Sequence, residues 1–402
     1  MRNHVFNLCA ATILVAASVG AVTVHTAADG STFDVTGGTL TITVPSGVTQ
    51  SSYDYVANVL NKSEYAVTAV VKDGPGVLAA RSAASYTGSW TVQAGVVTFK
   101  VANAFGSTSG TPATTGAITV MSGASIQSDS KDNTSLNNRR VFIAGAGDGS
   151  SYKGALIGTV AGSSAPNQGM IKNAQISLTD DATTWAAASC TMDFMNGTTV
   201  DLAGRTLNLG GGSWHNFYVY KAVITNSDEV AAATVKSPLA TNYKVHLCNS
   251  VWRGGSRNVL DMTGNGRNYI EGKVDTDWTV KMKGSVRGSR STSPLSVTNS
   301  YCIMASSFVV NGSVTVGNAD GTDPGFGLQL NGPITGNASS SLTVNKGAWV
   351  SFNGPVNTYE GSFTLSGGGN DTYRPIAYFQ AGTPFVRSPA ISNVMSTFPF
   401  HG

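Results

Sequence analysis

The stretch SYTGSWTVQAGVVTFKV, residues Ser85–Val101, contains the pattern that decides the fold. Two short runs rich in β-branched and aromatic residues flank a turn that ends at Gly95. Such residues suit the pleated surface of a strand, and glycine supplies the positive φ angle of a tight turn. The phrase returns near the other end as YEGSFTLSGG, residues Tyr359–Gly368, where Phe363 takes the place of Trp90. The unit is therefore strand, glycine turn, strand, and the chain contains it at least twice.

The middle of this unit, Thr-Val/Leu-x-x-Gly, recurs along the chain. Its copies are at Thr43–Gly47, Thr91–Gly95, Thr119–Gly123, Thr343–Gly347 and Thr364–Gly368. Solenoid repeats usually take roughly 20 to 30 residues for each coil, so neighbouring copies can lie one or two coils apart. A β-sandwich repeats in a similar way, but it needs antiparallel hairpins, and strong two-residue hairpin signals are rare here. The rhythm therefore predicts an all-β solenoid with irregular loops.

Composition supports this fold class and excludes others. Charged residues make up 12% of the 402 residues, against roughly 25% in an average soluble domain. A chain with so few charges cannot build many amphipathic helices with salt-bridged outer faces. The formal net charge is +3, which gives no electrostatic footprint for nucleic acid, so we expect no nucleic-acid partner.

The first 27 residues have the form of a secretory signal. A short basic start precedes an apolar run, and small residues crowd the end of that run, which predicts cleavage after Ala21 or Ala27. The run is also about long enough to span a membrane, so an uncleaved anchor is the alternative. We expect residues 28–380 to form one parallel β-helix and residues 381–402, which contain three prolines, to form a tail or a cap.

Ser85–Ile126 resembles the autotransporter-associated β-strand repeat of bacterial surface proteins. The matching positions are Tyr86, Gly88, Val92, Gly95, Phe105, Gly106, Val120, Gly123, Ala124 and Ile126. Ser341–Gly368 resembles the same repeat again. The resemblance implies a right-handed parallel β-helix that is exported and is displayed at, or released from, a bacterial surface. It also implies an association with the outer membrane, although the chain has no C-terminal run of alternating strands that ends in an aromatic residue.

Classical catalytic motifs are absent from the sequence, which has no G-x-S-x-G elbow, no H-E-x-x-H and no P-loop. Parallel β-helices can nevertheless act on polysaccharides, and glycoside hydrolysis needs two carboxyl groups across the scissile bond. Asp180 and Asp181 form an adjacent pair, and a polar turn is the alternative interpretation. Asp275 and Asp277 lie two apart, so on a strand they share a face. They could hold calcium with a further acid, or they could be solvated strand-end carboxylates.

Basic residues gather between Arg253 and Arg290, with Trp252, Tyr269 and Trp278 interleaved. The basic members are Arg253, Arg257, Arg267, Lys273, Lys281, Lys283, Arg287 and Arg290. One face of this segment could engage an acidic glycan. Alternatively, these residues are the polar outer positions of coils, where lysine discourages edge pairing.

The remaining chemistry-bearing residues are scattered. His215, His246 and His401 are isolated, and a metal site needs several converging ligands, so we expect packed or solvated side chains. Ser366–Ile376 resembles one calcium-binding nonapeptide of the RTX type, but such sites need tandem copies, which favours a turn. Cys190, Cys248 and Cys302 have no motif spacing, and we expect small buried side chains. The sequence thus predicts no catalytic residue, no cofactor site and no metal site.

These observations favour an exported, non-enzymatic β-helical protein of the passenger or adhesin type, found at the cell surface or outside the cell. Its expected partners are glycans or ligands on host or other cell surfaces. The alternative is a carbohydrate-active β-helix enzyme, a lyase or hydrolase, that acts on acidic glycans.

Overall fold

The structure, a computed structural model, describes most of the chain between Val22 and Val394. Within that part every secondary-structure element longer than two residues is a strand. The described residues are 22–51, 59–60, 62–81, 85–101, 103–128, 136–149, 153–158, 170–186, 190–212, 216–237, 240–271, 273–287, 301–304, 307–317, 326–354, 358–367, 375–379 and 390–394. No helix in these ranges is long and apolar enough to cross a membrane.

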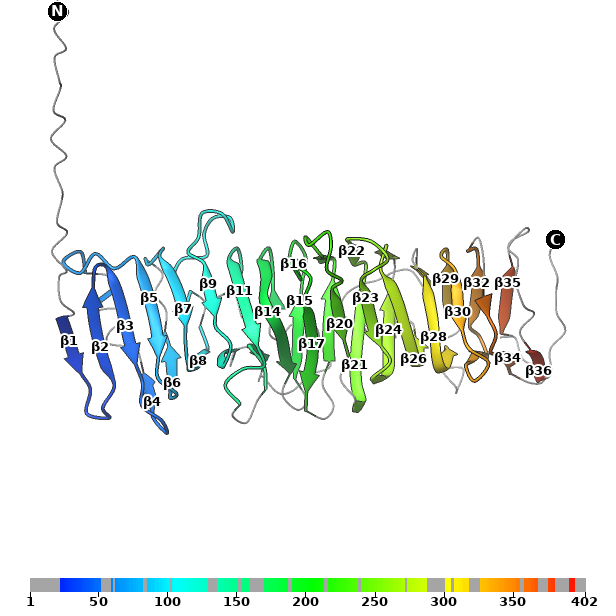
Figure 1. The fold of residues 1–402 in the computed structure, drawn as a ribbon, viewed down its shortest axis with the longest axis horizontal. Coiled ribbons are helices and arrows are strands. Elements are labelled where there is room, and N and C mark those ends of the chain that lie inside the picture. Colours follow the sequence, from blue (N-terminus) through cyan, green and yellow to red (C-terminus); the bar gives the residue numbers. More distant parts are fainter. Residues whose placement is uncertain are drawn as a thin grey trace, which may run out of the picture.

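Parallel strands stack in ladders along the long axis of the molecule (Figure 1). The first ladder runs from β3 to β35. It is continuous at β25, because the C-terminal half of β25 pairs with β22 and its N-terminal half pairs with β27. Its strands are β3 (Thr39–Thr43), β5 (Ala69–Asp73), β7 (Ser89–Val92), β9 (Ile118–Val120), β11 (Arg140–Gly145), β14 (Gln175–Ala186), β16 (Thr199–Asp201), β19 (Val223–Thr225), β22 (Val251–Arg253), β25 (Lys273–Thr276), β27 (Tyr301–Met304), β29 (Gly327–Leu330), β32 (Trp349–Phe352) and β35 (Ile376–Phe379).

The second ladder follows the first around each coil and shares β14 with it, because β14 bends through a corner at Thr179–Asp181. Its strands are β4 (Thr49–Ser51), β6 (Val77–Ala80), β8 (Gly95–Phe99), β10 (Ala124–Ser128), β12 (Leu156–Gly158), β14, β17 (Thr206–Gly211), β20 (Thr234–Lys236), β23 (Val259–Met262), β26 (Thr279–Arg287), β28 (Phe308–Val316), β30 (Ile334–Gly336) and β33 (Thr358–Tyr359).

A third ladder closes the coil from residue 170 onward, and it shares β26 and β28 with the second ladder. Its strands are β13 (Met170–Ile171), β15 (Thr191–Phe194), β18 (Asn216–Tyr220), β21 (Ala240–Cys248), β24 (Asn265–Glu271), β26, β28, β31 (Ser341–Asn345), β34 (Ser362–Ser366) and β36 (Ala390–Val394). The last strand, β36, pairs in parallel with β34, so a strand of the ladder lies inside the segment 381–402.

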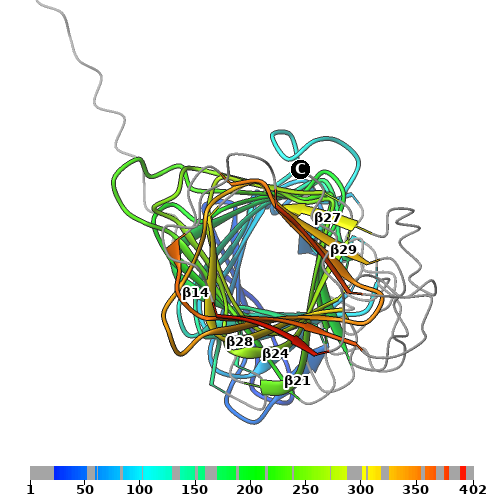
Figure 2. The same ribbon diagram turned by 90° about the vertical axis from the view of Figure 1, so that its right-hand side faces the viewer.

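The predicted parallel β-helix is confirmed, and several of its coils have the expected length, although Val141 pairs with Ile176, a step of 35 residues. Gln175 pairs with Thr199 and Thr199 with Val223, a step of 24 residues, while Ser341 pairs with Ser362, a step of 21. Viewed along the axis, the strands of successive coils superpose as the walls of one tube (Figure 2). Alternate residues point inward, and their apolar side chains fill the interior as one continuous core. Burying this apolar surface is the main force that stacks one coil on the next.

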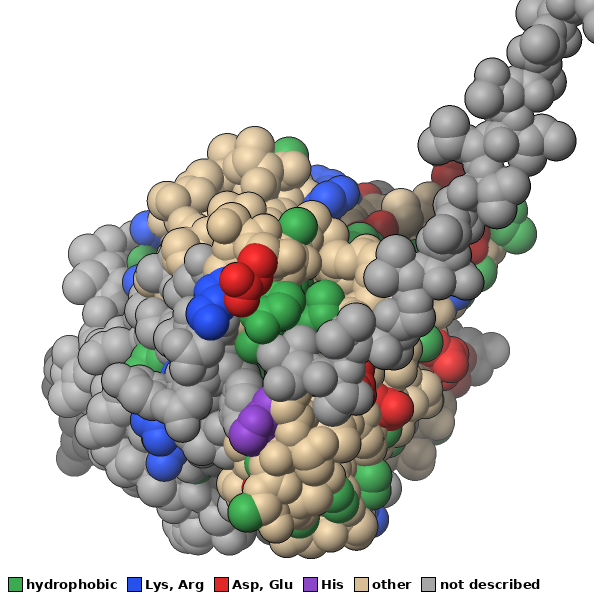
Figure 3. Space-filling view, turned by 90° about the vertical axis from the view of Figure 1, so that its left-hand side faces the viewer, with side chains coloured by type: hydrophobic (Ala, Val, Ile, Leu, Met, Phe, Trp, Pro, Cys, Tyr) green, Lys and Arg blue, Asp and Glu red, His purple; other side chains and the backbone are tan. Residues whose placement is uncertain are grey.

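The N-terminal end departs from the parallel pattern. β1 (Val22–Thr26) and β2 (Thr32–Thr36) pair antiparallel, and β2 pairs antiparallel with β3. The turn between β2 and β3 is Gly37–Gly38, and both glycines have positive φ, which is the two-residue hairpin geometry that needs glycine. β1 therefore covers the edge of β2. On the N-terminal end of the molecule, hydrophobic side chains lie near the centre and charged ones are scattered (Figure 3). A covered edge limits strand pairing with other chains.

Candidate functional surfaces of the solenoid

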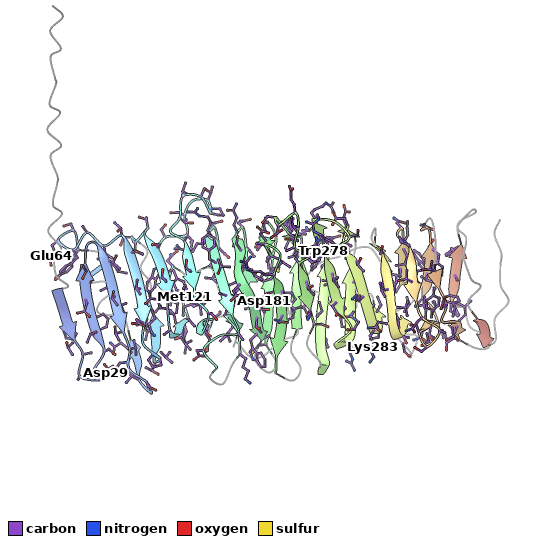
Figure 4. All side chains as sticks on the ribbon, in the orientation of Figure 1. Asp29, Glu64, Met121, Asp181, Trp278 and Lys283 are labelled. Atoms are coloured by element: carbon purple, nitrogen blue, oxygen red, sulfur yellow. The ribbon has the colours of Figure 1, made fainter. Side chains whose placement is uncertain are left out.

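The acidic pair Asp180–Asp181 lies at the corner where β14 turns from the first ladder into the second, midway along the molecule (Figure 4). Both side chains are exposed. The Oδ1 atom of Asp180 accepts a hydrogen bond from the backbone N–H of Asp181 at 2.8 Å, and Oδ1 of Asp181 accepts one from Thr206 N–H at 2.7 Å. The second bond joins two coils, so Asp181 helps to hold this corner in place.

Asp275 and Asp277 lie near the end of β25. Nη2 of Arg253 forms an ion pair with Oδ2 of Asp275 at 2.9 Å, and Nη1 of Arg253 donates to the Asp275 carbonyl at 3.0 Å. Oδ2 of Asp277 accepts a hydrogen bond from Gly254 N–H at 3.3 Å. Within the described ranges, no group of three or more His, Cys, Asp or Glu side chains is placed to hold a metal ion. Each acid instead ties its coil to the preceding one.

Trp252 and Trp278 are in the core, so the hypothesis that they line an outer glycan-binding face together with the basic residues is wrong for both. Their exposures are 1% and 0%, and their rings meet edge to face with centroids 5.3 Å apart. Their Nε1 atoms donate to Ser250 Oγ and to the Arg253 carbonyl, respectively, each at 3.0 Å. Alternation explains the outcome, because each tryptophan occupies an inward position of its coil.

The basic residues of this segment stand on different faces of the solenoid. Arg253 contacts β25, Arg257 donates to the Asp228 carbonyl at 2.6 Å, and the exposed Lys283 projects from the corner of β26, at the lower rim in Figure 4. The side chains of Lys273, Arg287 and Arg290 lie outside the described residues. The structure therefore does not bring Arg253, Arg257 and Lys283 together on one surface.

The third member of the aromatic set, Tyr269, belongs to a stack on the outer face of the third ladder. Its ring lies 4.4 Å from that of His246, which lies 4.1 Å from the ring of Tyr218, and both pairs are stacked. The register explains the stack, because Tyr218 pairs with His246 and His246 with Tyr269 on successive coils. Only 8% of His246 is exposed, so of the two expected alternatives, packed or solvated, this histidine is packed. His215 and His401 lie outside the described residues.

Cys190 and Cys248 are buried, as expected. Burial raises the pKa of the Cys190 thiol to about 11, so this thiol is protonated and unreactive near neutral pH. The side chain of Cys302 is not described, and neither is most of the RTX-like segment, residues 368–374.

Two buried cations in the N-terminal half, Arg139 and Lys72, donate hydrogen bonds to backbone carbonyls. Arg139 is 0% exposed, and its guanidinium donates to the carbonyls of Gly116 and Ser107, both at 2.9 Å. Burial lowers the pKa of Arg139 to about 10. These bonds fix the start and the end of the polar loop 106–115 on the solenoid wall. The sequence of the loop does not predict its bonds to Arg139, because every residue type has a backbone carbonyl.

Lys72 is the second buried cation, and it faces inward at the end of β5. Its Nζ donates to the carbonyls of Asp73, Gly74 and Ala94 at 3.0, 2.6 and 2.9 Å. Those three acceptors match the three donors of an ammonium group. Burial lowers the pKa of Lys72 to about 8, even though Asp73 and Asp148 favour the charged form.

An outer surface near the C-terminal end, which the sequence analysis did not identify, combines aromatic rings with side-chain amides. We call it the β29–β32–β35 face, after the three strands that lie side by side near that end in Figure 1. Trp349 pairs with Gly327, and a Cβ atom at Gly327 would lie 1.8 Å from the indole. The indole therefore lies flat over the glycine backbone. Its ring meets that of Tyr378 edge to face, with centroids 6.0 Å apart, and Tyr378 is 44% exposed.

Next to the rings on this face runs a row of amides and a hydroxyl. Oδ1 of Asn331 accepts hydrogen bonds from Gln329 Nε2 at 2.9 Å and from Asn353 Nδ2 at 3.0 Å. Ser351 Oγ donates to Oδ1 of Asn353 at 2.7 Å. Two coils thus contribute to one network that is partly open to solvent. The outward positions of these strands could have been found from the inward Val350 and Phe352, but the glycine beneath the indole follows only from the register.

Comparison of the chain with family models, with curated proteins and with solved structures finds no match.

Proposed function

We propose that this protein is an exported, non-enzymatic β-helical protein of the passenger or adhesin type that projects from or adheres at a bacterial cell surface. The observation that carries this proposal is the architecture: parallel coils stack along one axis into an elongated body with broad side walls (Figure 1). A stacked solenoid gains length by adding coils, each of which contacts only its neighbours, and its walls offer extended binding surfaces.

The environment of the acids favours a structural over a catalytic role for them. Asp181 holds the next coil, Asp275 is paired with Arg253, and Asp277 accepts a backbone N–H. A carboxyl that acts as general acid is usually set apart by an environment that raises its pKa. The resemblance of Ser85–Ile126 and Ser341–Gly368 to autotransporter-associated repeats supports export and the bacterial surface as the location.

Two measurements test the proposal. Cells that express the full chain are treated with protease while intact, and loss of the protein from intact cells, or its recovery from the medium, is the expected result. The purified chain is also incubated with pectin, alginate and neutral polysaccharides, and we expect no chain cleavage. A protein that stays protected inside intact cells would contradict export. Cleavage that Asp275→Ala or Asp277→Ala abolishes would instead establish the alternative, a carbohydrate-active enzyme.

A further inference from the structure

The described side chains of the three strands in the β29–β32–β35 face are all uncharged, unlike those of the other surfaces described above. Neither the strands themselves nor the residues after them, as far as Asn331 and Asn353, include an Asp, Glu, Lys or Arg. Its polar groups are amides and hydroxyls, which both donate and accept hydrogen bonds. Its apolar groups are a partly exposed indole and an exposed phenol ring. The face thus offers flat apolar rings beside neutral hydrogen-bonding groups.

We propose that the β29–β32–β35 face binds a neutral oligosaccharide, with one sugar ring packed against Trp349 and Tyr378 and the adjacent hydroxyls bonded to the amide row. This inference names the ligand class and the site, and it rests on the proposed adhesive function. Sugar rings present C–H groups on one face, which the negative face of an aromatic ring attracts. Sugar hydroxyls, like amides, are both donors and acceptors, so the two sets are complementary.

The geometry is built before any ligand arrives. Gly327 leaves no side chain beneath Trp349, so the indole is held flat against the wall rather than standing into solvent. The Asn331–Asn353 bond fixes the amides of two coils, and of the described residues none accepts a hydrogen bond from Nδ2 of Asn331. Neighbouring coils are about 4.8 Å apart, which is comparable with the length of one sugar unit, so a chain along the axis would meet one coil for each sugar.

The absence of charge decides between ligand classes. An acidic glycan or a nucleic acid would bring negative groups to three strands whose described side chains include no cation to neutralise them, and such binding depends on Lys and Arg. A protein partner is the other occupant to consider, in particular a second copy of this chain. The open amide row argues against it, because groups left without partners in a dry interface cost binding free energy.

The test uses the purified full chain, with cellohexaose and chitohexaose as neutral probes and hexagalacturonate as the acidic probe. Binding is measured by titration calorimetry and by tryptophan fluorescence. We expect the chain to bind at least one neutral hexamer and to bind hexagalacturonate much more weakly. Trp349→Ala and Tyr378→Ala should each weaken neutral binding about tenfold, the loss expected for one aromatic contact. Tyr378 is 44% exposed, so its variant tests the site without disturbing the core.

Trp185→Ala is the matched control. Trp185 also points outward over a glycine of the next coil, Gly210, but on the second ladder, away from the amide row. This variant should bind as the unaltered chain does, and circular dichroism should show folded β-structure for all three. Failure to bind either neutral hexamer, preference for hexagalacturonate, or unchanged binding by Trp349→Ala and Tyr378→Ala would overturn the site. A change in sedimentation with Tyr378→Ala would assign the face to a second copy instead. Any of these results leaves surface display untouched, because the protease experiment measures it separately.

Discussion

The hydroxyl of Tyr86 donates a hydrogen bond of 2.9 Å to the carbonyl of Ser89, three residues further along the chain. The second copy of the phrase does the same, since Tyr359 donates to Ser362 at 2.6 Å. Both tyrosines are buried, and burial raises the pKa of both hydroxyls, that of Tyr359 to about 12, so each remains a donor at neutral pH. The repeated sequence Tyr-x-Gly-Ser therefore forms a corner of the coil. In this corner the tyrosine hydroxyl donates to the carbonyl of the first residue of the next strand.

The first prediction concerns the glycine of this corner. A Cβ atom at Gly88 would lie 2.2 Å from the Thr68 carbonyl and 2.3 Å from the Tyr86 hydroxyl. Gly88→Ala should therefore lower the free energy of unfolding by about 1–3 kcal/mol, the usual cost of overpacking. Tyr86→Phe, which removes only the hydrogen bond, should cost about 1 kcal/mol. Urea unfolding measures both, with the exposed Thr87→Ala as the control. Equal stability of Gly88→Ala and the control would show that the corner does not constrain the coil.

The second prediction is a pH dependence that arises from Lys72. Its pKa is about 8 in the folded protein and near the ordinary value of 10.5 in the unfolded chain. Between these two pH values the unfolded chain binds more protons than the folded one, so the free energy of unfolding rises with pH. Below about pH 8 both states are protonated, and the cost of the buried charge is present in full.

The Lys72→Met variant lacks the titrating ammonium group, so this contribution to the pH dependence of its stability is absent. Comparing urea unfolding of the unaltered chain and this variant at pH 7 and pH 10 cancels the titration of other groups. We expect the unaltered chain to gain stability relative to Lys72→Met as the pH rises. If the stability of the unaltered chain relative to Lys72→Met instead stays constant or falls over this range, Lys72 keeps its ordinary pKa in the folded state.

The third prediction concerns two stacked asparagines that join coils by their side chains. Nδ2 of Asn226 donates to Oδ1 of Asn258 at 2.8 Å, and Oδ1 of Asn258 also accepts from Ala233 N–H at 2.8 Å. Asn258 is fully buried, so Asn258→Ala leaves several backbone groups without partners and should cost about 2–4 kcal/mol. Hydrogen exchange should speed up most at the Ala233 amide. The Gly204 amide, which donates to Asn226 Oδ1, serves as the internal control, and equal acceleration at both amides would indicate general loosening.

Local patterns in the sequence predicted the ladders because each strand is short and its inward positions are apolar. Leu40 and Ile42 alternate with outward threonines, and the structure buries both. The step between coils followed from the spacing of the Thr-Val/Leu-x-x-Gly copies. The hairpin at Gly37–Gly38 was missed, although two adjacent glycines between alternating runs are a recognised hairpin signal.

The sites were harder to predict because they depend on register between coils. The letter Trp does not say which way an indole points: Trp252 and Trp278 fill the core, whereas Trp349 lies on the outer wall. The flat position of the Trp349 indole against the wall is set by its pairing with Gly327, and no local pattern contains both residues. Likewise, the sequence does not show that Asp275 and Asp277 are bonded to Arg253 and Gly254, because those partners belong to the preceding coil.

The fourth prediction concerns the start of the mature chain. Cleavage after Ala21 keeps β1, whereas cleavage after Ala27 removes the whole strand, which begins at Val22 and pairs with β2. Removing β1 would remove its antiparallel hydrogen bonds to β2 and the turn between Ala27 and Ser31, which destabilises this end of the sheet. We therefore expect the exported protein to begin at Val22, as N-terminal sequencing or intact mass would show.

The same reasoning predicts how two truncated chains behave. A chain that begins at Val22 should remain monodisperse in light scattering, whereas one that begins at Ala28 should melt at a lower temperature and form larger species at the same concentration. Ser31 and Phe33, which β1 and its turn help to cover, would then lie closer to solvent. If both chains have the same melting temperature and size, β1 does not protect this end, and the choice between the two cleavage sites has no structural basis.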